Sequence, residues 1–341
     1  MNLRSFQSLE NWPRQISNPW KCRGTFVQLF AVALAALFCA AGCAAEKKNS
    51  PPPVAFDPAQ FDGSKALFEA VGLVNQGARD GGTPGAEKAA VYLAKRLQAA
   101  GVAVETDVFT SMTPRGPRLF RNVIGKLPGS ESNLILVCSH FDTKPGIGPD
   151  FQGANDSGSS SGVLLELARL LARREARGPE IRLVFFDGEE SLHDYTEIDG
   201  FHGSRHYAQK LVEQGCSRGT QMILLDMIGD QNLTVTMARN NDSKLATLFL
   251  QCSEAEGARS HFTLWPYEVG DDHSAFLERG IPAVDIIDFD YGSAPGRNDY
   301  WHTMQDTTDK LSADSLQIIG RVTLRVLNSL IAEDAARPEK K

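Results

Sequence analysis

Positive charge is scarce in this chain of 341 residues, in which 35 lysines and arginines stand against 42 aspartates and glutamates. The formal charge is −7 and the isoelectric point is near 5.6. No stretch forms a basic stripe with interleaved aromatic side chains, which is the usual mark of a nucleic-acid surface. Nucleic acid is therefore not expected as a partner, whereas a cationic substrate is permitted but not required.

Cysteine is too scattered for a thiolate metal site. Three of the six cysteines follow position 43, and none has the C-x-x-C spacing that metal ligands show. In an oxidising compartment, three thiols allow at most one disulfide. We therefore expect Cys138, Cys216 and Cys252 to be structural residues.

Long apolar runs are also missing, with one short run near the start of the chain. It extends from Phe26 to Ala41, roughly 16 residues, whereas a membrane-spanning helix needs about 20. Basic residues at 14, 21 and 23 precede it and small residues end it, an order typical of a secretory signal.

The end of this run, Ala40-Ala41-Gly42-Cys43, resembles the lipobox of bacterial lipoproteins. That resemblance implies a lipid on Cys43, whereas an ordinary cleaved signal and an uncleaved anchor are the alternatives. A polar, proline-rich stretch follows, as expected for a flexible tether. We expect a leader over 1–43, a tether over 44–62 and one domain over 63–335. The protein would then be exported and held on the bacterial cell envelope, on its periplasmic or extracellular face, with membrane contact only through Cys43.

Beyond the tether there is no repeat, and helical and extended patterns alternate. Continuous apolar runs such as "NLILVCSH" (133–140) and "IRLVFFD" (181–187) are typical of buried central strands. Helical spacing over 86–102, with Gly101 near its end, and a helix capped by Asn241 or Asp242 lie between such strands. The pattern predicts a single α/β domain whose central mixed, mostly parallel sheet is flanked by helices on both faces.

In such sheets, active sites form outside the carboxyl ends of the strands. Polar residues should therefore stand where each apolar run stops, or in the loops that follow. Five separated segments meet this expectation, with His140 and Asp142, Asp156, Glu189 and Glu190, Asp226, and His302, and a further segment adds Asp271, Asp272 and His273.

Each of these residues has an ordinary explanation alone, such as a helix cap or a solvated loop. Several carboxylates gathered without a cation, however, would cost several kcal/mol in repulsion and desolvation. A divalent cation offsets that cost. Carboxylate and imidazole donors without cysteine favour zinc in an open catalytic site.

From about residue 77 to residue 311 the chain resembles the zinc-dependent aminopeptidase family, and within it the animal-type glutaminyl cyclases. The family-wide elements are His140-x-Asp142, Asn155-Asp156, Glu189-Glu190, Asp226 and His302-Thr303. The elements typical of the cyclases are "HFDTK", "FFDGEE", "HGSRHYA", "LLDMIG", "DDHSAFLERGIP" and "WHTMQD".

The resemblance implies a metal site in one of two forms. In the cyclases one zinc ion is held by the residues matching Asp156, Glu190 and His302. In the aminopeptidases a second zinc shares Asp156 and takes the residues matching His140 and Asp226. The chain keeps both sets of ligands, so the ligands alone allow one zinc ion or two. Because the elements typical of the cyclases are present, one zinc ion is expected.

The resemblance also implies roles around the metal. Glu189 matches the general base and acid, in an acid network with Asp271 and Asp226, while Trp301 matches an aromatic wall of the substrate pocket. Tyr195 stands where cyclases tend to carry tryptophan. The expected reaction converts the N-terminal glutamine of peptides or proteins to pyroglutamate with release of ammonia. A two-zinc aminopeptidase is the main alternative, and a binding module on an inactive hydrolase fold is another.

Overall fold

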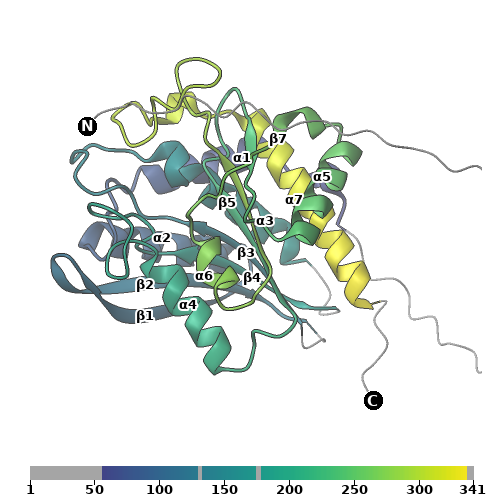
Figure 1. Cartoon of the computed structure of the whole chain (residues 1–341), viewed down its shortest axis with the longest axis horizontal. Helices are drawn as coiled ribbons and strands as arrows, with labels where there is room; N and C mark the ends of the chain where they lie inside the picture. The colour runs from purple at the N-terminus through teal and green to yellow at the C-terminus, as the bar shows by residue number, and fades with distance from the viewer. Residues whose placement is uncertain (1–55, 130–132, 174–177, 336–341) are drawn as a thin grey trace, which may run out of the picture. The chain divides into compact units, whose positions relative to one another are not determined.

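Eight strands form one mixed sheet in the computed structural model, which describes residues 56–129, 133–173 and 178–335 (Figure 1). The strands are β1 (Ala103–Thr113), β2 (Gly116–Leu127), β3 (Leu134–His140), β4 (Glu180–Phe186), β5 (Thr220–Asp226), β6 (Val235–Met237), β7 (Phe262–Leu264) and β8 (Ala283–Asp288). The α-helices are α1 (Gly63–Val74), α2 (Pro84–Ala99), α3 (Ser160–Leu171), α4 (His202–Glu213), α5 (Ser243–Ala255), α6 (His273–Leu277) and α7 (Ala313–Ala335). Short helical turns are η1 (Pro58–Gln60), η2 (Ala154–Ser159), η3 (Arg259–His261) and η4 (Thr308–Lys310).

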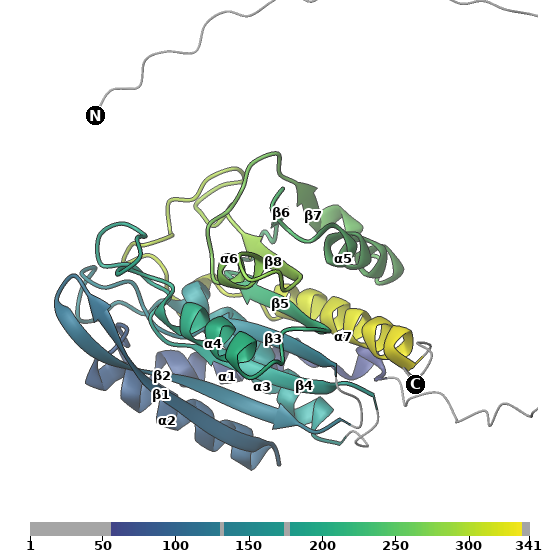
Figure 2. The same cartoon turned by 60° about the horizontal axis from the view of Figure 1, so that its bottom comes forward.

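The strands lie in the order β1-β2-β4-β3-β5-β8-β6-β7, which Figure 2 shows from one edge of the sheet to the other. The four central strands β4, β3, β5 and β8 are parallel. The hairpin β1–β2 adds an antiparallel edge, and β6 pairs antiparallel with β8. The predicted mixed, mostly parallel sheet is confirmed.

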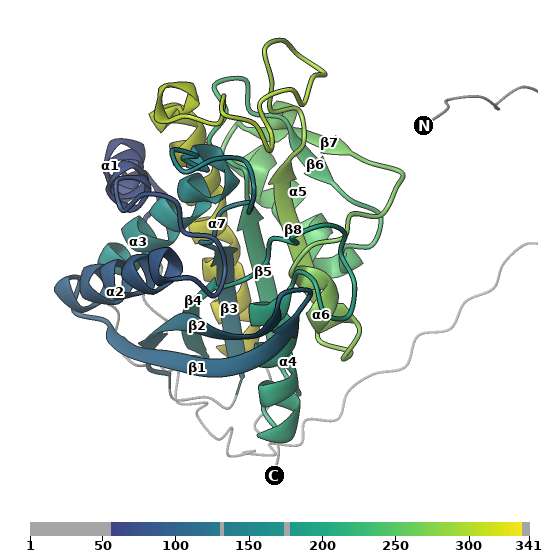
Figure 3. The ribbon, with the colours of Figure 1, turned by 90° about the vertical axis from the view of Figure 1, so that its left-hand side faces the viewer.

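Helices cover both faces because the side chains of a strand alternate in direction. In β3, Ile135 and Val137 pack in the core formed with α1, α2, α3, α5 and α7. Leu136 and Cys138 point the other way, into a second core with Tyr207 of α4 and other residues of α4 and α6. Figure 3 shows the two groups of helices on opposite sides of the sheet. Cys138, Cys216 and Cys252 are free thiols, and two of them are buried.

Helix ends follow local chemistry. Asp242 caps α5 by accepting hydrogen bonds from the backbone N–H groups of Lys244 and Leu245, as one of the two predicted caps. The helix predicted over 86–102 runs instead over Pro84–Ala99. It begins earlier because Thr83 caps it and proline is well tolerated in the first turn, and it ends before Gly101, whose φ is +85°.

The predicted leader with Cys43, and the tether as far as residue 55, lie outside the described residues. From Phe56 onward the chain contacts α7, where the N–H of Phe56 donates to Oδ1 of Asn328 at 2.8 Å. Phe61 is buried in the core. Within the described part of the chain, no helix is both long and apolar enough to cross a membrane.

Candidate active site

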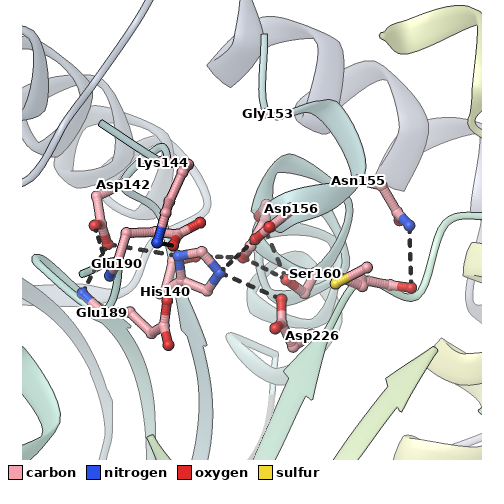
Figure 4. Close-up of polar contacts among 12 residues, drawn as sticks. His140, Asp142, Lys144, Gly153, Asn155, Asp156, Ser160, Glu189, Glu190 and Asp226 are labelled. Carbon is pink, nitrogen blue, oxygen red and sulfur yellow. Dashed lines mark hydrogen bonds and ion pairs between the residues drawn. The ribbon is translucent and has the colours of Figure 1, made fainter. Parts of the chain in front are cut away.

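Three neighbouring parallel strands deliver acidic and imidazole side chains to one edge of the sheet. His140 is the last residue of β3, Asp226 is the last residue of β5, and Glu189 and Glu190 follow β4 directly after a turn. The registers of β3 with β4 and with β5 bring these strand ends level. Figure 4 shows the side chains converging from the strand ends, with Asp156 facing them from η2.

Asp156, Glu190 and His302 form the first group that could hold a metal ion. Nε2 of His302 lies 3.0 Å from Oε1 of Glu190 and 3.3 Å from Oδ2 of Asp156. Burial disfavours the charged imidazole, but the two carboxylates outweigh it and raise the pKa of His302 to about 9. The group thus presents two carboxylates and one imidazole around a common point.

His140, Asp156 and Asp226 form the second group. Nε2 of His140 lies 3.0 Å from Oδ1 of Asp156 and 3.3 Å from Oδ1 of Asp226. On the other side of the ring, Nδ1 lies 3.5 Å from Oδ1 of Asp142. The two groups therefore share Asp156, which stands between them.

The unsatisfied atoms of these groups fit a cation. Nε2 of His140, Oδ2 of Asp156 and Oδ1 of Asp226 are buried and form no hydrogen bond, and their charged neighbours at 3.0–3.3 Å are members of the same two groups. A buried polar atom without a partner costs about 1–3 kcal/mol, so several of them together call for a ligand. Carboxylate and imidazole donors without thiolate suit zinc in a catalytic type of site.

Glu189 and Glu190 lie on one turn and have different surroundings. Their backbone N–H groups donate to Oδ1 and Oδ2 of Asp142 at 3.1 and 3.2 Å, so that one carboxylate holds both residues. Glu190 belongs to a metal group, whereas Glu189 belongs to neither. Burial, and then the negative charge of Glu190, raise the pKa of Glu189 well above its usual value. A carboxyl group of this kind suits proton transfer.

The first metal group opens on a cavity of about 100 Å³. The ring of Trp301 stacks on that of His302 with centroids 3.9 Å apart, so this wall of the cavity packs directly on a possible metal ligand. His140 does not line this cavity. The lining is made of Asp156, Glu189, Glu190, Tyr195, Asp226, Met227, Gly270, Asp271, Ile287, Phe289, Trp301 and His302.

The acid network implied by the resemblance lies against this cavity. Burial, followed by the charges of Asp285, Asp226 and Glu189, raises the pKa of Asp271 well above its usual value. Oδ2 of Asp271 is buried without a hydrogen-bond partner. Asp271, Asp226 and Glu189 thus line one cavity, and the charges of the other two help to keep a proton on Asp271.

Two buried side chains that the sequence did not single out hold the loop of Asp156. The guanidinium of Arg79 is fully buried and donates to the carbonyls of Phe141, Gln152 and Gly153 at 2.5–2.6 Å. Asp306 accepts from the N–H groups of Asn155 and Asp156 at 2.7 and 3.2 Å. Lys144 was also missed, and its ammonium lies 3.4 Å from Oε2 of Glu190.

Backbone strain is also concentrated here. Phe201, Met227 and His302 are the non-glycine residues of the described segments with positive φ, at 54°, 49° and 55°. Such conformations cost of order 1–3 kcal/mol and persist where surrounding structure enforces them. One of the three is a possible metal ligand, one follows Asp226 and one stacks on Tyr195.

Comparisons with known proteins agree with this geometry. The model of Peptidase family M28 matches residues 122–327. Glutaminyl-peptide cyclotransferase of Boiga irregularis is 31% identical over 282 residues, covering 71% of this chain and 74% of the relative. The crystal structure of an Acidobacteriales bacterium glutaminyl cyclase is 33% identical with a TM-score of 0.75, over 84% of this chain and 98% of that one.

A Zn-dependent exopeptidase from Parabacteroides distasonis also has this fold, with 27% identity and a TM-score of 0.69 over 78% of this chain and 98% of that one. The fold is thus shared by cyclases and exopeptidases. With a family match over more than half its length and a cyclotransferase relative above 30% identity, the chain belongs to peptidase family M28, on its glutaminyl-peptide cyclotransferase branch.

Proposed function

We propose that this protein converts the N-terminal glutamine of peptides or proteins to pyroglutamate and releases ammonia, with one zinc ion held by Asp156, Glu190 and His302. The observation that carries the proposal is that two adjacent glutamates occupy different positions relative to the possible metal ligands. Glu190 stands in the metal group, and Glu189 lies beside it, outside both groups, in the same cavity.

In the reaction, the α-amine nitrogen forms a bond to the γ-carbonyl carbon and the bond from that carbon to the side-chain nitrogen breaks. A bound zinc ion would supply Lewis acidity toward the γ-carbonyl oxygen. The carboxylate of Glu189 takes a proton from the α-amine and returns it to the leaving nitrogen, which departs as ammonia. Asp271 and Asp226, which line the same cavity as Glu189, would orient its carboxylate.

A single ion is favoured by access to the cavity. His302 and Glu190 line it, whereas His140 is shut away behind Asp156 and Asp226. A catalytic metal needs an open position for substrate. All three residues of the first group line the cavity, whereas the second group borders it only through Asp156 and Asp226. Trp301 and Tyr195 form walls of this cavity, and shielding of the bound substrate from water would favour cyclisation over hydrolysis.

The test is to incubate purified protein with a peptide beginning with glutamine and with one beginning with leucine. Ammonia released from the first peptide, with the second left intact, is the expected result. Hydrolysis of the leucine peptide would instead identify a two-zinc aminopeptidase. No reaction with either peptide would identify a binding module.

We also propose that the chain is exported and anchored to a bacterial envelope membrane by a lipid on Cys43. The support is the sequence Ala40-Ala41-Gly42-Cys43 after an apolar run. Replacing Cys43 by serine should move the protein from the membrane fraction to the soluble fraction. Wild-type protein that is already soluble after export would identify an ordinary cleaved signal.

A further inference from the structure

Tyr195 lies in the loop between β4 and α4, with its ring fixed on one side. The ring stacks on Phe201, with centroids 4.4 Å apart and an interplanar angle of 16°. Gly200, with φ of +84°, passes so close that a Cβ there would lie 2.5 Å from Cδ1 of Tyr195. The ring therefore occupies space that depends on a glycine in the left-handed region.

The hydroxyl group of this ring meets both glutamates. It lies 3.5 Å from Oε2 of Glu189 and 3.4 Å from Oε2 of Glu190. A tyrosine hydroxyl has one proton to donate, so the two carboxylates compete for it. The hydroxyl thus links the possible metal ligand to the proposed base.

Lys144 approaches the same oxygen of Glu190 from another strand end. Its ammonium lies 3.4 Å from Oε2 of Glu190, 3.0 Å from Oγ of Ser191 and 5.5 Å from the centroid of the Tyr195 ring. The side chain is only 14% exposed, so its charge is poorly screened by water. Figure 4 shows Lys144 above the carboxylate of Glu190.

The two oxygens of Glu190 are therefore in different positions. Oε2 faces Lys144 and the hydroxyl of Tyr195, whereas Oε1 faces Nε2 of His302 at 3.0 Å. Because the carboxylate is planar and rigid, contacts that hold Oε2 also fix the direction in which Oε1 points. Outer contacts of this kind orient metal ligands and contribute to their affinity.

We propose that Tyr195 and Lys144 are positioning residues that hold Oε2 of Glu190 and so direct Oε1 to the metal. The inference rests on the proposed function only for the assignment of Glu190 as a zinc ligand. It gives Tyr195 a polar role in addition to that of a wall. The role belongs to the hydroxyl, since a phenylalanine would supply the same ring.

The experiment measures zinc affinity of the full-length protein by competition with a chelator, independently of any turnover. Tyr195→Phe keeps the ring and removes the hydroxyl, and Lys144→Met removes the charge. Each should weaken zinc binding about 10-fold, the lower end of the loss seen for outer contacts of metal ligands. Because both act on one oxygen, the double variant should lose less than the product of the two single losses.

Tyr207→Phe is the matched control, since it deletes a tyrosine hydroxyl that accepts a hydrogen bond from Arg182 in the core near α4. It should leave zinc affinity unchanged. Lys144→Arg keeps the charge and should recover most of the affinity lost in Lys144→Met. Circular dichroism of each variant establishes that it is folded, and Tyr195→Phe decides the matter alone if Lys144→Met does not fold.

Wild-type zinc affinity in folded Tyr195→Phe would overturn the proposal and leave Tyr195 as a wall only. This outcome is distinct from failure of the proposed function. A protein that hydrolyses the leucine peptide would still show the loss of zinc affinity if Tyr195 and Lys144 position Glu190.

Discussion

The two possible metal groups share Asp156 and similar donors, yet their surroundings differ. The side chain of His140 is 1% exposed and enclosed by three carboxylates, whereas that of His302 is 17% exposed and borders the cavity. The donor atoms lie equally close together in both groups, but the histidine of the first group borders the cavity and that of the second does not. A group of side chains becomes a candidate for catalysis when its cation can also reach a substrate.

The largest expected effect is on chemistry, in the variant Glu189→Gln. Loss of a general acid and base lowers kcat by about 10²–10⁴-fold. Because Glu189 belongs to neither metal group, zinc content should stay at the wild-type value. Steady-state kinetics and metal analysis of the same sample check both points, and near-native turnover would refute the role of Glu189.

The comparison of the two histidines is the next test. We expect one zinc per chain, and His302→Ala should weaken its binding more than about 100-fold, because a direct ligand is lost. His140→Ala should cost about 10–100-fold, as for an outer contact, since His140 contacts the shared Asp156. Chelator competition measures both. A larger loss in His140→Ala, or two tightly bound ions, would reverse the assignment.

A change behind Asp156 should act on both groups together. The two carboxylate oxygens of Asp306 accept from the N–H groups of Asn155 and Asp156, and Asp306→Asn replaces one of these oxygens with an NH2 group that cannot accept. The loop of Asp156 should loosen, and zinc affinity should fall about 10-fold, as for other outer contacts. Unchanged zinc affinity in this variant would show that Arg79 alone holds the loop.

A separate expected effect concerns stability, not zinc binding or chemistry, at the end of β8, outside both groups. Burial raises the pKa of Asp288 to about 7. Between pH 4 and 7 the unfolded chain has ionised this carboxyl while the folded protein keeps its proton, so the free energy of unfolding falls as pH rises. Asp288→Asn should remove this dependence. The free energy of unfolding of the variant minus that of the wild type should therefore rise by up to about 4 kcal/mol between pH 4 and pH 8. Denaturant unfolding at the two pH values measures it, and parallel pH curves would contradict the prediction.

The sequence was sufficient for the parts of the site that depend on local pattern. Apolar runs ending in His140, Asp226 and the two glutamates predicted which side chains meet, because parallel strands in register end at one edge. The sequence pattern also singled out His302 and Asp271, but the roles assigned to them came from the resemblance, since their loops have no periodic pattern of their own.

The supporting contacts could not be predicted in this way. Arg79 reaches Phe141 across 62 positions and Asp306 reaches Asn155 across 151, through bonds to backbone that leave no spacing rule. Nothing around Lys144 marks it as a partner of Glu190. The hydroxyl contacts of Tyr195 depend on the path of its loop over the glutamates, which Phe201 and Gly200 fix in three dimensions.

The carboxylate of Asp142 accepts hydrogen bonds from the N–H groups of both Glu189 and Glu190. It therefore holds the backbone of the two residues in one position. The spacing between the proposed proton carrier, Glu189, and the possible ligand, Glu190, is then fixed by the peptide unit that joins them. The loop of Trp301 and His302 is attached elsewhere, after β8. A redesign of the pocket at Trp301 would therefore leave this pair of glutamates in place, and its effect on the site would pass through His302, on which Trp301 stacks.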